Sequence, residues 1–118
     1  MHLHDALVAA DAIGSFIAGR TLEQYGTDLM LRSAAERQFE ILGEALRRAL
    51  AVDPGLETRL PTLRGVIDFR NVIAHEYDRL ADATVWDLAV NELPRLRVDL
   101  AAELGRRGGG QSTSTRAK

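Results

Sequence analysis

The chain contains no cysteine in its 118 residues, so neither disulfide bonds nor thiolate ligands for a metal are available to it. No stretch approaches the roughly 18–20 consecutive apolar residues of a membrane-spanning helix. The N-terminal sequence MHLHDALVAADAIGSF carries two aspartates and no basic segment, which is unlike a secretory signal. These absences predict a soluble, cytoplasmic protein.

The chain is also poor in aromatic residues, proline and lysine. Its net charge of −2 provides no overall basic field that would attract nucleic acid. Lys118 is the one lysine among fifteen basic residues, and the remainder are arginine. A GC-rich coding sequence explains this bias more simply than phosphate binding does. The chain is rich in alanine, leucine, arginine and glutamate, a composition typical of helical proteins.

The spacing of apolar residues predicts four main helices. The first three cover residues 3–19, 28–51 and 61–75. The fourth begins at Thr84, a plausible N-cap, and Pro94 within it predicts a kink. We therefore predict an all-α, up-down bundle of four to five helices over residues 1–104. The Gly- and Ser-rich segment 105–118 is predicted to be a disordered tail.

The sequence DFRNVIAHEYDRL, residues 68–80, places polar side chains where the third helix should pack. Arg70 lies seven residues after Leu63 and seven before Tyr77, so all three share one side of a helix. Asn71 and His75 are four residues apart on the adjoining side. A charged arginine within an apolar stripe is unfavourable unless it is paired or faces a polar cavity. The pattern indicates an ion pair, an interface or a ligand site.

A purely structural role is open for each of these residues. Arg70 has Glu44 and Asp68 as possible partners for an ion pair. His75 near a helix end is stabilised by the helix dipole, and Asn71 is a common local hydrogen-bonding residue. The tyrosine that follows would pack its ring in the core with its hydroxyl at the surface.

Taken together, these residues resemble a known family motif. RNVIAHEY (70–77) has the form R-x4-H-x-Y with asparagine directly after the arginine. FEILGEAL (39–46), VWDLAVNELPRL (85–96) and DAI (11–13) resemble flanking segments of the same family. The family is the HepT-like branch of the HEPN superfamily, the toxin component of HepT–MntA (type VII) toxin–antitoxin pairs. The similarity spans about residues 5–100. Leu63 and Asp68 stand where some related sequences have tryptophan and glycine.

The resemblance implies a metal-independent endoribonuclease toxin that has Arg70 and His75 as catalytic residues and Asn71 in support. This chemistry is physically reasonable, because RNA supplies its own nucleophile, the 2′-hydroxyl. A histidine near neutral pKa is suited to proton transfer, and an arginine is suited to the charge that builds on the phosphate. The expected products carry a 2′,3′-cyclic phosphate and a 5′-hydroxyl. No cofactor or metal is expected in this chain.

Such a reaction needs both an acid and a base, whereas each motif offers one histidine. A twofold homodimer with facing motifs would supply both, and the resemblance implies such a dimer. An arginine inside an apolar stripe also fits an interface between two copies of the chain. Two copies of Arg70, with Arg64 or Arg79 as additional cations, would make a local positive groove for RNA.

For the tyrosine of the motif, Tyr77, the resemblance implies a separate role. The MntA-like antitoxin is a minimal nucleotidyltransferase that uses ATP and magnesium to attach AMP to the matching tyrosine. Added phosphates next to the cleft would repel the RNA backbone and occupy the arginines. The ATP and magnesium would belong to the antitoxin partner.

The sequence also bears on three further residues and on two alternative functions. Glu44 is a candidate to orient Arg70 across the bundle, with a solvent-facing position as the alternative. His2 and His4, spaced i, i+2, are interpreted as surface residues. The main alternative function is a non-catalytic HEPN subunit that binds nucleotide or RNA beside a nucleotidyltransferase. A third possible role is that of a purely structural dimeric bundle.

Overall fold

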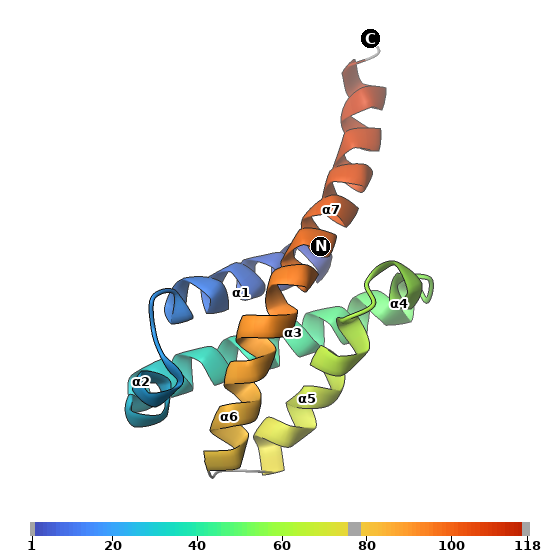
Figure 1. Cartoon of the computed structure of the whole chain (residues 1–118). Coiled ribbons are helices and arrows are strands. Elements are labelled where there is room, and N and C mark those ends of the chain that lie inside the picture. Colours follow the sequence, from blue (N-terminus) through green and yellow to red (C-terminus); the bar gives the residue numbers. More distant parts are fainter. Residues whose placement is uncertain (1, 76–78, 117–118) are drawn as a thin grey trace.

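A computed structural model describes the backbone of residues 2–75 and 79–116, and the side chains of residues 2–69 and 82–107. Within these ranges the chain forms helices and turns, with no strand, which confirms the predicted all-α class (Figure 1). The elements are, in chain order, α1 (His2–Ile17), α2 (Leu22–Thr27), α3 (Leu29–Val52), α4 (Leu56–Arg59), α5 (Leu63–His75), α6 (Arg79–Asp87), the π-helical turn η1 (Leu88–Glu92) and α7 (Leu93–Arg116).

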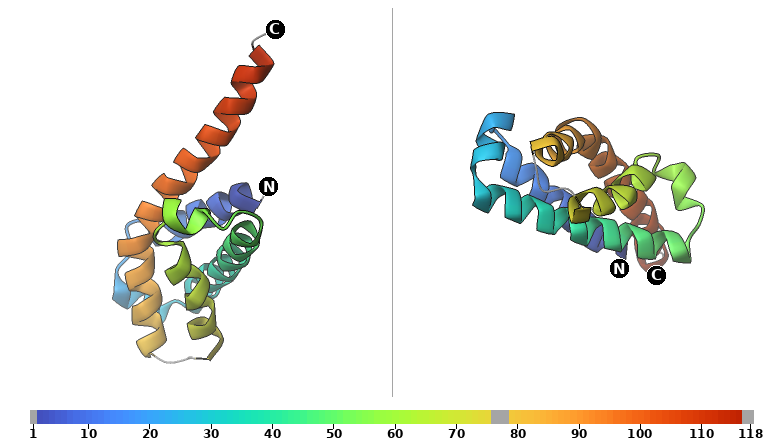
Figure 2. Two further views of the ribbon diagram at one scale, coloured as in Figure 1. Left: turned by 90° about the vertical axis from the view of Figure 1, so that its right-hand side faces the viewer. Right: turned by 90° about the horizontal axis from the view of Figure 1, so that it is seen from below.

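The long helices form a bundle around one apolar core. α1 and α3 lie antiparallel and in contact, α5 packs on α3, and α7 packs on α1 (Figures 1 and 2). Buried leucine, alanine and phenylalanine side chains from all of these helices meet between them. Phe39, Leu42 and Leu46, spaced three and four residues apart along α3, are almost fully buried. Val8 on α1 is exposed.

Two short helices were not predicted from the sequence. α2 begins with a capping box, in which the Thr21 hydroxyl accepts from the Gln24 N–H at 3.1 Å and the Gln24 side chain accepts from the Thr21 N–H at 2.9 Å. This reciprocal pair satisfies two backbone donors at the helix start. Gly19 before it has a φ of 74°, a left-handed conformation that favours glycine. α4 is a single turn that seats Leu56 in the core.

The last long helix begins earlier than predicted. Thr84 was expected to be its N-cap, but α6 begins at Arg79 and Thr84 lies inside it. The part of α6 before Thr84 has a tertiary contact of its own, because the Asp82 carboxylate lies 3.8 Å from the Arg32 guanidinium of α3. Tertiary contacts of this kind override a local capping signal.

The kink predicted at Pro94 takes the form of a π-helical turn directly before it. The Leu93 N–H donates to the carbonyl of Leu88, five residues earlier. A proline ring inside an α-helix clashes with the carbonyl four residues before it and removes one hydrogen bond. The wider turn accommodates this break, so α6, η1 and α7 continue as one bent helix (Figure 1).

The described backbone continues as α7 to Arg116, whereas the composition predicts disorder over residues 105–118. Beyond the bundle α7 projects away from the other helices (Figure 2). Helix propagation adds one hydrogen bond per residue and needs no new nucleus, and Arg107 anchors the first projecting turn through its 2.9 Å contact with Asp53. The division into a domain, 1–104, and a separate tail stays a prediction.

A first prediction concerns Tyr25, whose side chain is fully buried while its hydroxyl has no hydrogen-bond partner. Burying such a group costs about 1–3 kcal/mol. We expect Tyr25→Phe to raise the free energy of unfolding by about 1 kcal/mol, because the ring and its contact with Trp86 are kept. Urea denaturation at pH 7 measures this. A loss of stability in Tyr25→Phe would show that the hydroxyl is satisfied after all.

A second prediction concerns Glu103, which is 3% exposed. Burial alone would raise its pKa, but hydrogen bonds from Arg59 and Arg107 outweigh it and hold the pKa below its ordinary value. A carboxyl with a lowered folded pKa stabilises above its unfolded pKa, and this stabilisation is lost as the pH falls through the folded pKa. Stability should therefore fall below about pH 4–5, the range where a free carboxyl begins to bind protons.

Glu103→Gln is expected to flatten this acid-side fall and to lower stability at pH 7 by about 2 kcal/mol. Glu36 offers a contrasting control, because burial and then Asp82 raise its pKa. Its ionised form is disfavoured in the folded state, so Glu36→Gln should stabilise the protein at neutral pH. Urea titrations between pH 3 and 7 measure both effects. An unchanged acid slope in Glu103→Gln would contradict this assignment.

Candidate active site

The motif lies on the second half of α5, whose first half is fixed in the core. Leu63 and Val66 are almost fully buried, while Arg64 is exposed. The backbone is helical through His75, so position 70 follows Leu63 by two turns on the same side of α5. Positions 71 and 75 are one turn apart. The side chains of Arg70, Asn71 and His75 are outside those described, and Tyr77 lies outside the described residues altogether.

One aromatic contact secures α5 just before the motif. The Phe69 ring on α5 meets the Phe39 ring on α3 edge to face, with centroids 5.6 Å apart. Both side chains are buried. This geometry is favourable for aromatic pairs beyond simple burial. The residue directly before Arg70 is therefore packed against the middle of the longest helix in the core.

The second half of α5 and the start of α6 meet at one end of the bundle. This end is opposite to the projecting part of α7 (Figures 1 and 2). Three residues, 76–78, connect the two helices. The helical part of the motif, Arg70 to His75, therefore leads toward this end of the bundle.

Glu44 lies on α3 and is partly exposed. Its carboxylate accepts from Arg47 at 2.7 Å and from Arg48 at 2.8 Å, both on the same helix. These contacts show that Glu44 is engaged with arginine side chains. Its expected contact with Arg70 stays a prediction, because the Arg70 side chain is outside those described.

The arginines of the described side chains are consistently paired with acids. Each of them has a carboxylate oxygen within 4.0 Å of a guanidinium nitrogen. Arg64, considered above as an additional cation for RNA, pairs with Glu57 at 3.3 Å, and this hydrogen bond raises its pKa. In this part of the chain, therefore, no surface is rich in unpaired arginine. The other basic residues of the chain, Arg70, Arg79, Arg116 and Lys118, lie outside the described side chains.

A polar cluster beside the start of α6 was missed by sequence reasoning. Arg32 of α3 donates to the carbonyl of Gly26 at 2.5 Å and lies 3.8 Å from the Asp82 carboxylate of α6. Burial, followed by the negative charges of Glu36 and Asp82, raises the pKa of Tyr25, and burial also raises the pKa of Glu36. These residues come from three helices, of which α2 was not predicted. No spacing in the sequence could therefore have identified the cluster.

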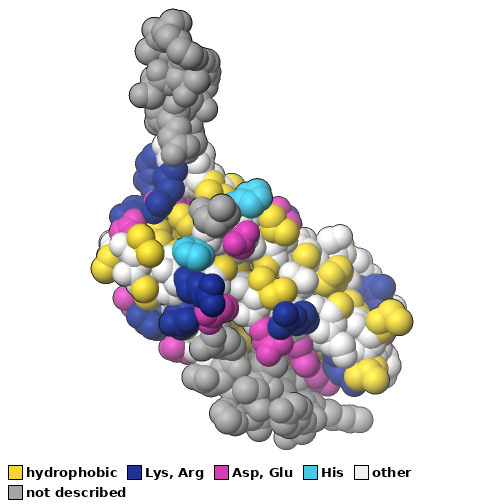
Figure 3. Space-filling view, turned by 180° about the vertical axis from the view of Figure 1, so that it is seen from behind, with side chains coloured by type: hydrophobic (Ala, Val, Ile, Leu, Met, Phe, Trp, Pro, Cys, Tyr) yellow, Lys and Arg dark blue, Asp and Glu magenta, His cyan; other side chains and the backbone are white. Residues whose placement is uncertain are grey.

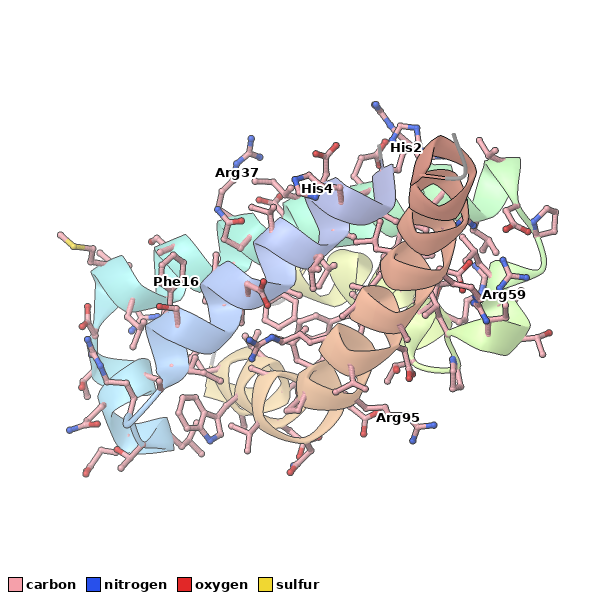
Figure 4. All side chains as sticks on the ribbon, turned by 90° about the horizontal axis from the view of Figure 1, so that it is seen from above. His2, His4, Phe16, Arg37, Arg59 and Arg95 are labelled. Atoms are coloured by element: carbon pink, nitrogen blue, oxygen red, sulfur yellow. The ribbon has the colours of Figure 1, made fainter. Side chains whose placement is uncertain are left out.

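His2 and His4 line a groove between α1 and α3 with a volume of about 670 Å³. Arg37 borders the same groove (Figure 4). Figure 3 shows histidine side chains on this face beside acidic, basic and apolar ones. Among the described residues, no three His, Cys, Asp or Glu side chains are grouped so as to hold a metal ion. The same residues include no helix long and apolar enough to cross a membrane.

The chain is a helical bundle, and the arginine and histidine of its R-x4-H-x-Y segment lie on the backbone of α5. The model of the family described as "Ribonuclease HepT-like" matches residues 6–102. The chain therefore belongs to the HepT-like ribonuclease family, which confirms the family resemblance drawn from the motif and its flanking segments.

A curated relative and a structure search complete the comparison. The chain is similar to a protein from Methanocaldococcus jannaschii named "Putative RNase MJ1380". The two are 22% identical over 100 residues, which cover 83% of this chain and 89% of the relative. No solved structure gave a significant match. The similarity to the relative thus extends over nearly the whole bundle and includes the motif helix.

Proposed function

We propose that the protein is a metal-independent endoribonuclease toxin whose active site is built from Arg70 and His75, with Asn71 in support. The observation that carries this proposal is the R-x4-H-x-Y motif on α5 within a chain that the ribonuclease family model covers over residues 6–102. The motif supplies the two residue types that RNA cleavage needs.

In the proposed reaction the 2′-hydroxyl oxygen attacks the adjacent phosphorus and the 5′-oxygen leaves. A base takes the proton from the 2′-hydroxyl, and an acid protonates the departing 5′-oxygen. His75 is suited to either transfer near neutral pH. Arg70 stabilises the negative charge that accumulates on the phosphate oxygens. The products are a 2′,3′-cyclic phosphate end and a 5′-hydroxyl end.

The proposed active form is a twofold dimer with two facing α5–α6 ends. Two motifs then supply two histidines, so that one acts as the base and the other as the acid. The paired state of the described arginines is compatible with this arrangement, in which Arg70 and Arg79 of the two copies would supply positive charge for RNA. We further propose that a nucleotidyltransferase antitoxin inhibits the enzyme by attaching AMP to Tyr77, the tyrosine that follows the motif.

The test is a ribonuclease assay on the purified protein in EDTA, with analysis of the product ends and the intact mass of the same sample. Cleavage that leaves cyclic-phosphate ends supports the proposal. An inactive protein heavier by whole AMP units would be an already modified toxin. An inactive, unmodified protein would contradict the proposal for the RNAs tested, and RNA binding without cleavage would favour the non-catalytic binding subunit.

A further inference from the structure

A closed ring of ion pairs lies at the end of the bundle opposite to the motif. Asp53 accepts from Arg59 at 2.5 Å and from Arg107 at 2.9 Å. Glu103 accepts from the same two arginines, at 3.1 Å each, and Arg106 also contacts it. Each acid thus contacts both arginines of the ring. We refer to Asp53, Arg59, Glu103 and Arg107 as the Glu103 clamp.

Glu103 is the least exposed member of the clamp. It is 3% exposed, whereas the side chains of Arg59 and Asp53 are about one-third exposed. A buried carboxylate needs several donors to offset the loss of water, and here it has three arginines. Arg59 lies beside α7 where that helix passes the short α4 (Figure 4). The clamp therefore joins the end of α3, the single turn of α4 and the middle of α7.

The clamp is directly connected to the start of the motif helix. After Arg59, only Leu60, Pro61 and Thr62 precede α5. Leu60 is buried, and its carbonyl accepts from the Leu63 N–H at 2.9 Å. The connection is thus short and hydrogen-bonded, so a displacement of Arg59 is passed on to the first turn of α5.

The length of α5 amplifies such a displacement. His75 lies about 18 Å from the start of the helix, at 1.5 Å per residue. A tilt of about 10° at that start would move the motif end by roughly 3 Å, and an error of about 1 Å in a catalytic group can lower a rate 100-fold. Phe39 and Phe69 restrain the middle of α5, so the clamp and this aromatic pair together determine the direction of the helix.

We propose that Glu103 is a positioning residue for RNA cleavage: through Arg59 it fixes the N-terminal end of α5 and thereby holds Arg70 and His75 in their working geometry. This inference rests on the proposed ribonuclease function. Glu103 itself lies at the far end of α5 from the motif. Its effect should therefore be on the rate of the chemical step and on the local stability of α5, and not on the affinity for RNA.

The test uses two variants that disturb the clamp in different ways. Glu103→Gln removes the charge that Arg59 contacts. Gly55→Ala changes no charge, but its added methyl group would lie 2.9 Å from the Arg59 guanidinium and 3.3 Å from the Asp53 carboxylate, so that the end of the Arg59 side chain has to shift away from its present contacts. The matched control is Asp99→Asn, because Asp99 pairs only with Arg95 of its own helix.

Hydrogen exchange resolved by segment and single-turnover cleavage are the two measurements. We expect Glu103→Gln and Gly55→Ala to accelerate amide exchange in α5 at least tenfold more than in α1, where any increase reflects only the general loss of stability. The cleavage rate at saturating RNA should fall about tenfold with the half-saturating RNA concentration unchanged. Asp99→Asn should change neither quantity.

Faster exchange in every helix alike would mean a general loss of stability, and it would overturn the proposal, as would unchanged exchange in α5. If Glu103→Gln does not fold, Gly55→Ala still tests the proposal. Gly55 has an ordinary helical φ of −66° that alanine readily adopts. If the unmodified wild-type protein cleaves no RNA, the ribonuclease function fails, and the exchange pattern alone decides whether Glu103 fixes α5.

Discussion

Replacing His75 with alanine is expected to lower the rate of RNA cleavage about 100-fold or more, with RNA binding retained. A positioned acid or base contributes about 100- to 10,000-fold to a rate, and histidine contributes little charge to RNA binding at neutral pH. Single-turnover cleavage of a labelled RNA in EDTA measures the rate, and fluorescence anisotropy measures binding. The matched control is His4→Ala, because His4 is an exposed histidine on α1 outside the motif.

Arg70→Ala tests the other half of the motif and should weaken both the rate and the binding, because the arginine contacts phosphate in the ground state and in the transition state. Arg64→Ala is its matched control on the same helix, where Arg64 pairs with Glu57 at the surface. Equal cleavage by wild type and His75→Ala would remove His75 from the mechanism. A loss of RNA binding with both motif variants, and no cleavage by any protein, would favour the binding subunit.

The salt dependence of binding separates the proposed site from a general basic surface. Each phosphate contact contributes about one unit to the slope of log affinity against log salt concentration. The described arginines are already paired with acids, so the slope should be small and should come from the α5–α6 end. A steep slope that persists in Arg70→Ala would place the RNA on another surface.

The sequence was most informative where the signal was periodic. The helices predicted at 3–19, 28–51 and 61–75 correspond to α1, α3 and α5, with ends that differ by up to two residues. Repeating apolar positions specify such helices because one face must enter the core. Two short helices were missed, since six residues in α2 and four in α4 are too few to repeat an apolar period. Thr21 and Gln24 did carry a usable signal for α2, the capping box.

Features that depend on tertiary contacts could not be predicted. The Glu103–Arg59 pair joins residues 44 positions apart, and nothing in either local sequence identifies the partner. Tyr25 is buried because it lies on α2, and the spacing of apolar residues did not predict that helix. The motif was identified by its resemblance to a family and not by its spacing alone. The roles of Arg70, Asn71, His75 and Tyr77 therefore stay predictions for the experiments above.

Phe39→Ala is expected to cause one of the largest losses of stability in the chain, about 3–4 kcal/mol. The ring is 1% exposed and meets Phe69 edge to face, so its removal opens a cavity between α3 and the motif helix. The thermal midpoint should fall by roughly 10 °C or more. Val98→Ala, at a 67% exposed position on α7, should change stability by no more than about 0.5 kcal/mol.

The double variant Phe39→Ala/Phe69→Ala shows whether the two rings act together. If the pair contributes as a unit, the two losses will not add, and the coupling free energy should be about 0.5–1.5 kcal/mol. Additive losses would mean that each ring packs independently and that α5 is not directed by this contact. Strong coupling, together with a reduced cleavage rate in Phe69→Ala below its unfolding temperature, would instead show that core packing just before Arg70 sets the geometry of the motif.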